Sequence, residues 1–145
     1  MSVQKLKTLR FGEVKVGDRL APLAVPITTT LVVAGAIASR DYQDVHHDKG
    51  AARRQGMQDV FMNILTTNGL VGRFVTDWAG PEAIIENVAI KLGAPNFPGD
   101  TMKMSGEVKS AETRGGRGVV TVEVLGGNAY GAHVTGTVRL TLPLE

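Results

Sequence analysis

Residues 59–81 read Asp-Val-Phe-Met-Asn-Ile-Leu-Thr-Thr-Asn-Gly-Leu-Val-Gly-Arg-Phe-Val-Thr-Asp-Trp-Ala-Gly-Pro, and this stretch sets the architecture. Its apolar residues recur at steps of three and four, which predicts an amphipathic helix over residues 60–79. The buried stripe consists of Phe61, Ile64, Leu65, Val71, Val75 and Trp78. Asp59 is a capping residue type, and Gly80-Pro81 ends the pattern. A helix of roughly 18 residues is about 27 Å long, enough to cross a small sheet.

Strand-like runs follow this helix at residues 83–92, 101–111, 119–125 and 132–142. Clusters of Gly, Asn and Pro separate the runs, which predicts a meander of antiparallel strands. One further strand is expected at residues 23–27, where Pro26 restricts it to an edge or an end of the sheet. A long helix with an antiparallel sheet makes this an α+β fold.

Length and composition predict a single domain that spans residues 1–145, in which residues 1–12 are a loosely held arm. The chain has no cysteine, which excludes a disulfide framework, a thiolate metal site and a cysteine nucleophile. No apolar run approaches the roughly 20 residues of a membrane helix, and no signal sequence is recognisable, so the expected location is the cytoplasm. The net charge is +2, from 16 basic and 14 acidic residues, so the chain lacks the excess of positive charge that is typical of nucleic-acid-binding proteins.

Two shorter helical segments precede the long helix. Residues 31–38 are continuously apolar and follow three threonines that can cap a helix, although a buried strand is the alternative in so short a run. Residues 49–55 are rich in Ala and Arg and predict a surface helix that Gly56 closes.

Between these segments lie residues 39–48, Ser-Arg-Asp-Tyr-Gln-Asp-Val-His-His-Asp. Asp41 and His46 are five positions apart, a spacing that a short turn can fold into one pocket. An imidazole moves protons near neutral pH, and a nearby carboxylate fixes its tautomer or acts as a second base. The alternative is a solvated surface turn, in which Asp and His are also common.

The octapeptide from Asp41 to Asp48 resembles the Asp-x-Asn-Pro-(Ile/Leu)-His-x-Asp signature of the MaoC-like, (R)-specific enoyl-CoA hydratases, which have a hot-dog fold. The sequence departs from that family at Arg40, Gln43 and Asp44, where Gly, Asn and Pro are usual. Residues 40–48 and 75–81 are similar to the small hydratase subunit of actinobacterial steroid side-chain degradation. The resemblance implies a single hot-dog domain in which Asp41 and His46, and not His47, are catalytic.

The same resemblance implies addition of water across the 2,3 double bond of an enoyl-CoA thioester, here a steroid-CoA with a shortened unsaturated side chain. No cofactor is expected, because coenzyme A is part of the substrate. The backbone N–H of Val60, which aligns with the Gly of the family's His-Gly-Met segment and lies at the expected start of the long helix, is the candidate donor to the thioester oxygen. No metal is expected, because adjacent histidines cannot both face one site from an extended chain.

Five side chains are candidates for substrate binding: Gln43, Asn63, Asn68, Arg53 and Arg54. The two asparagines and Thr67 follow a different stripe of the long helix from its apolar residues, so they can line a cavity or remain exposed. The two arginines suit the phosphates of coenzyme A, although a solvated helix face is the alternative.

A lone hot-dog chain leaves a sheet edge exposed, so pairing with a second subunit is expected, with the site near the interface. The resemblance favours a second MaoC-like chain in a heterodimer or heterotetramer, and a homodimer is the alternative. Competing functions are an (R)-3-hydroxyacyl-acyl-carrier-protein dehydratase, a hot-dog thioesterase and a non-catalytic partner subunit. His133, alone on the last strand, is expected to be structural.

Overall fold

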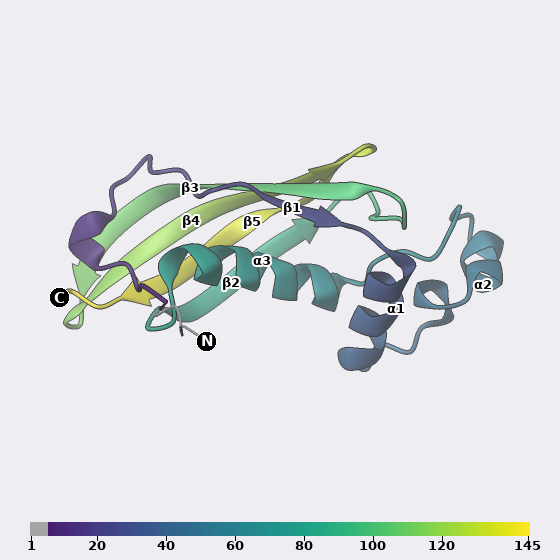
Figure 1. Cartoon of the computed structure of the whole chain (residues 1–145), viewed down its shortest axis with the longest axis horizontal. Helices are drawn as coiled ribbons and strands as arrows, with labels where there is room; N and C mark the ends of the chain where they lie inside the picture. The colour runs from purple at the N-terminus through teal and green to yellow at the C-terminus, as the bar shows by residue number, and fades with distance from the viewer. Residues whose placement is uncertain (1–5) are drawn as a thin grey trace, which may run out of the picture.

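A computed structural model describes residues 6–145, which form one five-stranded antiparallel sheet in the order β1-β3-β4-β5-β2 (Figure 1). The strands are β1 (Leu23–Pro26), β2 (Ile84–Leu92), β3 (Thr101–Arg114), β4 (Arg117–Asn128) and β5 (Gly131–Leu142). All five expected strands are therefore confirmed. β1 is an edge strand that ends at Pro26, as a residue without an N–H requires.

The helix α3 (Ile64–Ala79) lies across one face of this curved sheet and buries Val71, Phe74 and Val75 in the core (Figure 1). Ile64 and Leu65, which were expected in the buried stripe, are each 49% exposed. Phe74 packs directly on the backbone of β3, where a Cβ atom at Gly106 would lie 2.9 Å from the ring. Glycine is therefore needed for this close approach. The arrangement is the expected α+β hot-dog fold. Within residues 6–145, no helix is both long and apolar enough to cross a membrane.

The start of α3 differs from the prediction. The helix begins at Ile64 and not at Val60, and its N-cap is Asn63, whose Oδ1 accepts a hydrogen bond from the N–H of Thr66 at 3.0 Å. The carboxylate of Asp59, expected as the cap, instead forms an ion pair with Lys49 at 2.9 Å. Residues 60–63 consequently form a non-helical lead-in to the helix.

The shorter helices gather beyond one end of the sheet, opposite the end where the C-terminus lies (Figure 1). Residues 31–38 are helical, as expected, in α1 (Thr29–Ala38), and Thr28 caps this helix by accepting from Leu31 at 3.0 Å. The 3₁₀ turn η2 (Asp44–His46) and the helix α2 (Lys49–Arg54) follow. This group of short elements carries the signature residues.

The N-terminal segment is held more firmly than expected over the part that the structure describes. The N–H of Leu9 donates to the carbonyl of Ala79, and the N–H of Phe11 donates to that of Pro143, both at 2.9 Å. Phe11 also begins the short 3₁₀ turn η1 (Phe11–Glu13). Residues 6–12 are therefore tied to the domain, and residues 1–5 lie outside the described residues.

The strand β2 forms the second edge of the sheet. It pairs with β5 along one side, and no other strand within residues 6–145 pairs with its outer side. Ile84 at its start is 55% exposed. This edge leaves a row of backbone N–H and C=O groups open to another chain.

Candidate active site

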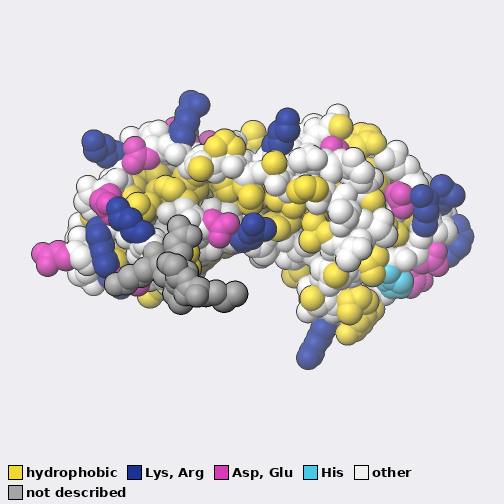
Figure 2. Space-filling model, viewed as in Figure 1, with side chains coloured by type: hydrophobic (Ala, Val, Ile, Leu, Met, Phe, Trp, Pro, Cys, Tyr) yellow, Lys and Arg dark blue, Asp and Glu magenta, His cyan; other side chains and the backbone are white. Residues whose placement is uncertain are grey.

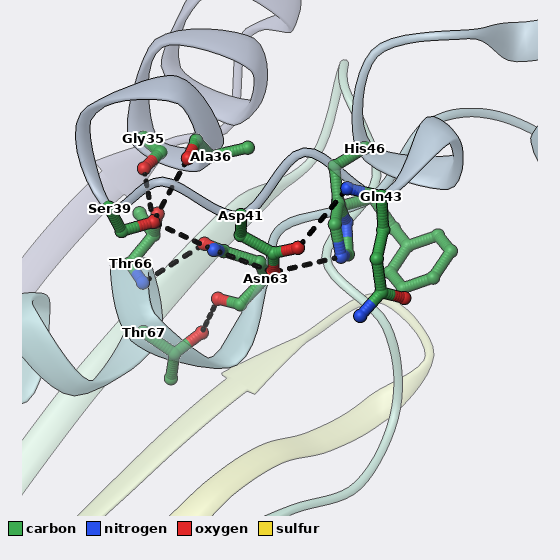
Figure 3. Close-up of polar contacts among 10 residues, drawn as sticks. Gly35, Ala36, Ser39, Asp41, Gln43, His46, Asn63, Thr66 and Thr67 are labelled. Atoms are coloured by element: carbon green, nitrogen blue, oxygen red, sulfur yellow. Dashed lines mark hydrogen bonds and ion pairs between the residues drawn. The ribbon is translucent and has the colours of Figure 1, made fainter.

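Asp41 and His46 meet in space. Asp41 lies just after the end of α1, and the single turn of η2 brings His46 back toward it, so that His46 Nε2 is 3.4 Å from Asp41 Oδ2 (Figure 3). The side chain of His46 is 7% exposed and that of Asp41 is 15% exposed. The neighbouring His47 is much more exposed, and its Nε2 lies 3.8 Å from Asp44. The structure thus brings His46, and not His47, to Asp41.

A backbone contact fixes the imidazole of His46. Its Nδ1 lies 2.7 Å from the carbonyl oxygen of Phe61, which can only accept a hydrogen bond, so Nδ1 carries the proton. In the neutral ring, Nε2 therefore presents a lone pair toward Asp41. The ring of Phe61 packs edge-on against the imidazole, with the centroids 4.9 Å apart, and restricts its rotation.

Two donors hold the carboxylate of Asp41. The Nδ2 of Asn63 donates to Oδ2 at 3.0 Å, and the backbone N–H of Gln43 donates to Oδ1 at 3.3 Å (Figure 3). The hydrogen bond from Asn63 is the main reason that the pKa of Asp41 is lowered; Gln43 and His46 act in the same direction, and burial opposes them. Asp41 is therefore a carboxylate at neutral pH.

The pair consequently presents two acceptors to one small space. A water molecule has two protons, so it can donate one to Asp41 Oδ2 and the other to His46 Nε2. Its oxygen then directs a lone pair away from the protein. This arrangement suits activation of water for attack on an electron-poor carbon.

The candidate oxyanion donor, the N–H of Val60, does not lie at the start of a helix. Val60 lies four residues before the first residue of α3, so its N–H does not gain from the dipole of that helix. That N–H already donates to Asp59 Oδ1 at 2.8 Å. The expected helix start at Val60 is therefore wrong, and the assignment of its N–H as the oxyanion donor stays a prediction.

The structure separates the candidate substrate-binding residues. Gln43 is exposed, and its side chain extends alongside His46, so it remains available to a ligand (Figure 3). Asn63 is only 2% exposed and uses its amide on protein groups, so it does not line a cavity. Asn68 is exposed on α3, five residues and about 7.5 Å along the axis from Asn63, and is not brought to the pair. On this helix Thr67, and not Asn68, faces inward.

Arg53 and Arg54 are exposed in the last turn of α2. Figure 2 shows Lys and Arg side chains gathered at the end of the molecule where α2 lies. The two guanidinium groups are therefore accessible to a phosphate in solution, at the same end of the fold as the Asp41–His46 pair.

His133 is buried, as expected for a structural residue. Its Nδ1 lies 2.6 Å from the carbonyl oxygen of Ala94 and its Nε2 lies 2.8 Å from Thr67 Oγ1. Burial lowers the pKa of His133, and the contact with Ala94 opposes that shift. The neutral ring thus links β5 to the inner face of α3.

Two groups of the site were missed from the sequence. Ser39 was assigned no role from the sequence, yet its hydroxyl accepts a hydrogen bond from Asn63 at 2.9 Å. Phe61 was interpreted only as part of an apolar stripe, yet its carbonyl holds His46. A backbone carbonyl leaves no mark in the sequence, whereas the serine two residues before Asp41 was visible as a polar side chain near the pair.

Comparisons with known proteins agree with this fold. A family model described as the MaoC like domain matches residues 12–128. The 3-oxo-4,17-pregnadiene-20-carboxyl-CoA hydratase beta subunit of Mycobacterium tuberculosis is 47% identical over 127 residues, which are 88% of this chain and 95% of that protein.

Solved structures of two related proteins have a similar fold. One chain in the crystal structure of the ChsH1-ChsH2 complex from the same organism has a TM-score of 0.83 at 47% identity, over 88% of this chain and 98% of that one. The (R)-hydratase from A. caviae involved in PHA biosynthesis has a TM-score of 0.79 over 90% of this chain and 98% of that one; at 22% identity, it shows a shared fold alone. Because the family model covers most of the sequence, this chain belongs to the MaoC-like domain family.

Proposed function

We propose that this chain is the catalytic small subunit of a heteromeric enoyl-CoA hydratase that adds water to a steroid-CoA with a shortened unsaturated side chain. The observation that carries the proposal is the Asp41–His46 pair, in which Asp41 Oδ2 and His46 Nε2 lie 3.4 Å apart. The relative at 47% identity supports the substrate class, because it is named a pregnadiene carboxyl-CoA hydratase beta subunit. The two-chain complex in which a 47% identical chain was solved supports a second, different subunit.

Hydration would proceed through a water molecule held between the two side chains. Asp41, with His46 beside it, accepts one proton from the water while the water oxygen forms a bond to Cβ. The π electrons move to the thioester and leave an enolate. The proton then passes from the pair to Cα, so that one water has been added and the carboxylate is restored.

Binding of the substrate is assigned to exposed side chains around this pair. Gln43 lies next to His46 and is placed to contact the acyl thioester. Arg53 and Arg54 would bind the coenzyme A phosphates, which suit guanidinium geometry. We assign no cofactor, because carboxylate and imidazole supply both proton transfers and coenzyme A arrives with the substrate. A coenzyme A thioester as substrate supports a cytoplasmic location.

The test is a hydration assay that follows loss of the enoyl-thioester absorbance. The chain is purified alone and co-purified with a second MaoC-like subunit, and each sample receives crotonyl-CoA, crotonyl-acyl-carrier protein and a steroid enoyl-CoA. The proposal predicts turnover of the steroid substrate by the two-subunit sample and loss of that turnover in Asp41→Asn. Preference for the carrier-protein thioester would replace the proposal with a dehydratase of fatty-acid elongation. Full activity of Asp41→Asn would make this chain a non-catalytic partner.

A further inference from the structure

We propose that Asn63 is a positioning residue for the hydration reaction: it holds the carboxylate of Asp41 in one orientation and keeps it available as a base. The proposal rests on the proposed function, since it assigns Asn63 a role through Asp41. It also replaces the interpretation of Asn63 as a cavity-lining residue, because only 2% of this residue is exposed.

The amide of Asn63 is engaged on every side. Oδ1 accepts the N–H of Thr66 at 3.0 Å and thereby caps α3, while Nδ2 donates to Asp41 Oδ2 at 3.0 Å and to Ser39 Oγ at 2.9 Å (Figure 3). Turning the amide over would place its oxygen against the carboxylate and its N–H groups against the N–H of Thr66. The helix cap therefore determines which end of the amide faces Asp41.

Ser39 fixes the direction of the second hydrogen bond. Its hydroxyl has one proton, which it donates to the carbonyl of Gly35 at 2.7 Å, with the carbonyl of Ala36 at 3.1 Å. Its oxygen is then left to accept from Asn63. The last turn of α1, the first turn of α3 and Asp41 are consequently joined through one amide.

A structural role alone does not require asparagine at this position. Ser, Thr and Asp cap helices about as well, but an aspartate has no proton to donate and a hydroxyl has only one. Asparagine offers one acceptor for the helix and two donors for the turn. As the N-cap of a 16-residue helix, it also brings the Asp41 carboxylate to the positive end of the helix dipole, which favours a negative charge.

Two substitutions separate positioning from capping. Asn63→Asp keeps the cap but replaces the donor with a second carboxylate about 3 Å from that of Asp41. Repulsion between the two carboxylates raises the pKa of Asp41, so a higher pH is needed before Asp41 can act as a base. Asn63→Ser also keeps a cap, adds no charge and is the fallback if Asn63→Asp does not fold. Asn68→Asp is the matched control, because it makes the same change at an exposed position of the same helix.

The experiment measures the pH dependence of kcat/KM for the two-subunit enzyme with the steroid enoyl-CoA, together with thermal unfolding of each variant. We expect the acidic limb to move up by about one pH unit or more in Asn63→Asp and by less in Asn63→Ser. Asn68→Asp should keep the wild-type profile. An acidic limb that stays at its wild-type position in both Asn63 variants would overturn the proposal.

Asp41→Asn distinguishes this failure from failure of the proposed function. If Asp41→Asn is inactive while both Asn63 variants keep the wild-type acidic limb, only the role of Asn63 is wrong. If Asp41→Asn is fully active, the catalytic pair is wrong, and the positioning role is overturned with it.

Discussion

Replacing each of the adjacent histidines by alanine tests the geometry of the site most directly. In His46→Ala the enzyme loses the group whose Nδ1 is held by Phe61 and whose Nε2 faces Asp41. In His47→Ala it loses a partly exposed ring whose Nε2 lies 3.8 Å from Asp44. The two changes are neighbours in sequence and identical in chemistry, so each controls for the other.

The losses of activity expected for the two substitutions differ by orders of magnitude. A positioned acid–base group contributes about 10²- to 10⁴-fold to the rate, which is about 2.7–5.4 kcal/mol in the activation free energy. We expect a loss in that range for His46→Ala. An exposed ion pair stabilises a protein by about 0–1 kcal/mol, so His47→Ala should change both activity and stability little.

The assay is kcat/KM for hydration of the steroid enoyl-CoA by the two-subunit enzyme, with urea unfolding as the control. His46→Ala leaves the carbonyl of Phe61 without its donor, which costs about 1–3 kcal/mol of stability, so the variant is assayed well below its unfolding midpoint. Comparable losses of activity from the two substitutions, with both proteins folded, would refute the assignment of His46.

Two further predictions concern stability. Arg40 has φ +58°, a left-handed conformation that costs a residue with a side chain about 1 kcal/mol or more. Arg40→Gly should therefore raise the free energy of unfolding by about that amount and move the urea midpoint upward; a lower midpoint would contradict this. The pKa of His133 is lowered in the folded state, so as the pH falls below about 6.5 the unfolded chain binds the proton first. The free energy of unfolding then decreases by up to about 1.4 kcal/mol per pH unit, until the pH reaches the pKa of His133 in the folded state. Urea titrations at pH 7.5 and 5.5 check this: His133→Asn should lose less stability between the two pH values than the wild type, and an equal loss in both proteins would contradict the role of burial.

The parts of the fold that depend on local pattern were predictable from the sequence. Alternating runs, turn residues and a three-to-four-residue apolar spacing located the five strands and α3. The Asp41–His46 contact was also predictable, because five residues and one turn are enough to close it and the signature residues are present. Its chemical role came from the family resemblance and not from the spacing.

The rest depended on contacts between distant segments. Asp59 and Asn63 are both good caps, and the difference arises from Lys49 pairing with Asp59 while Asn63 binds Asp41, 22 residues away. The error placed the expected helix start at Val60, four residues before the observed start at Ile64. Likewise, the polar N-terminal segment gave no sign that its backbone pairs with residues 70 and 132 positions further along.

The open edge of β2 has a consequence for how the protein is produced in the cell. A nine-residue strand with one unpaired side and an exposed Ile84 is a template to which any other extended chain can add. Copies of this chain in which the edge stays uncovered are therefore open to self-association. If the proposed second subunit covers this edge, balanced synthesis of the two chains would protect this one from aggregation.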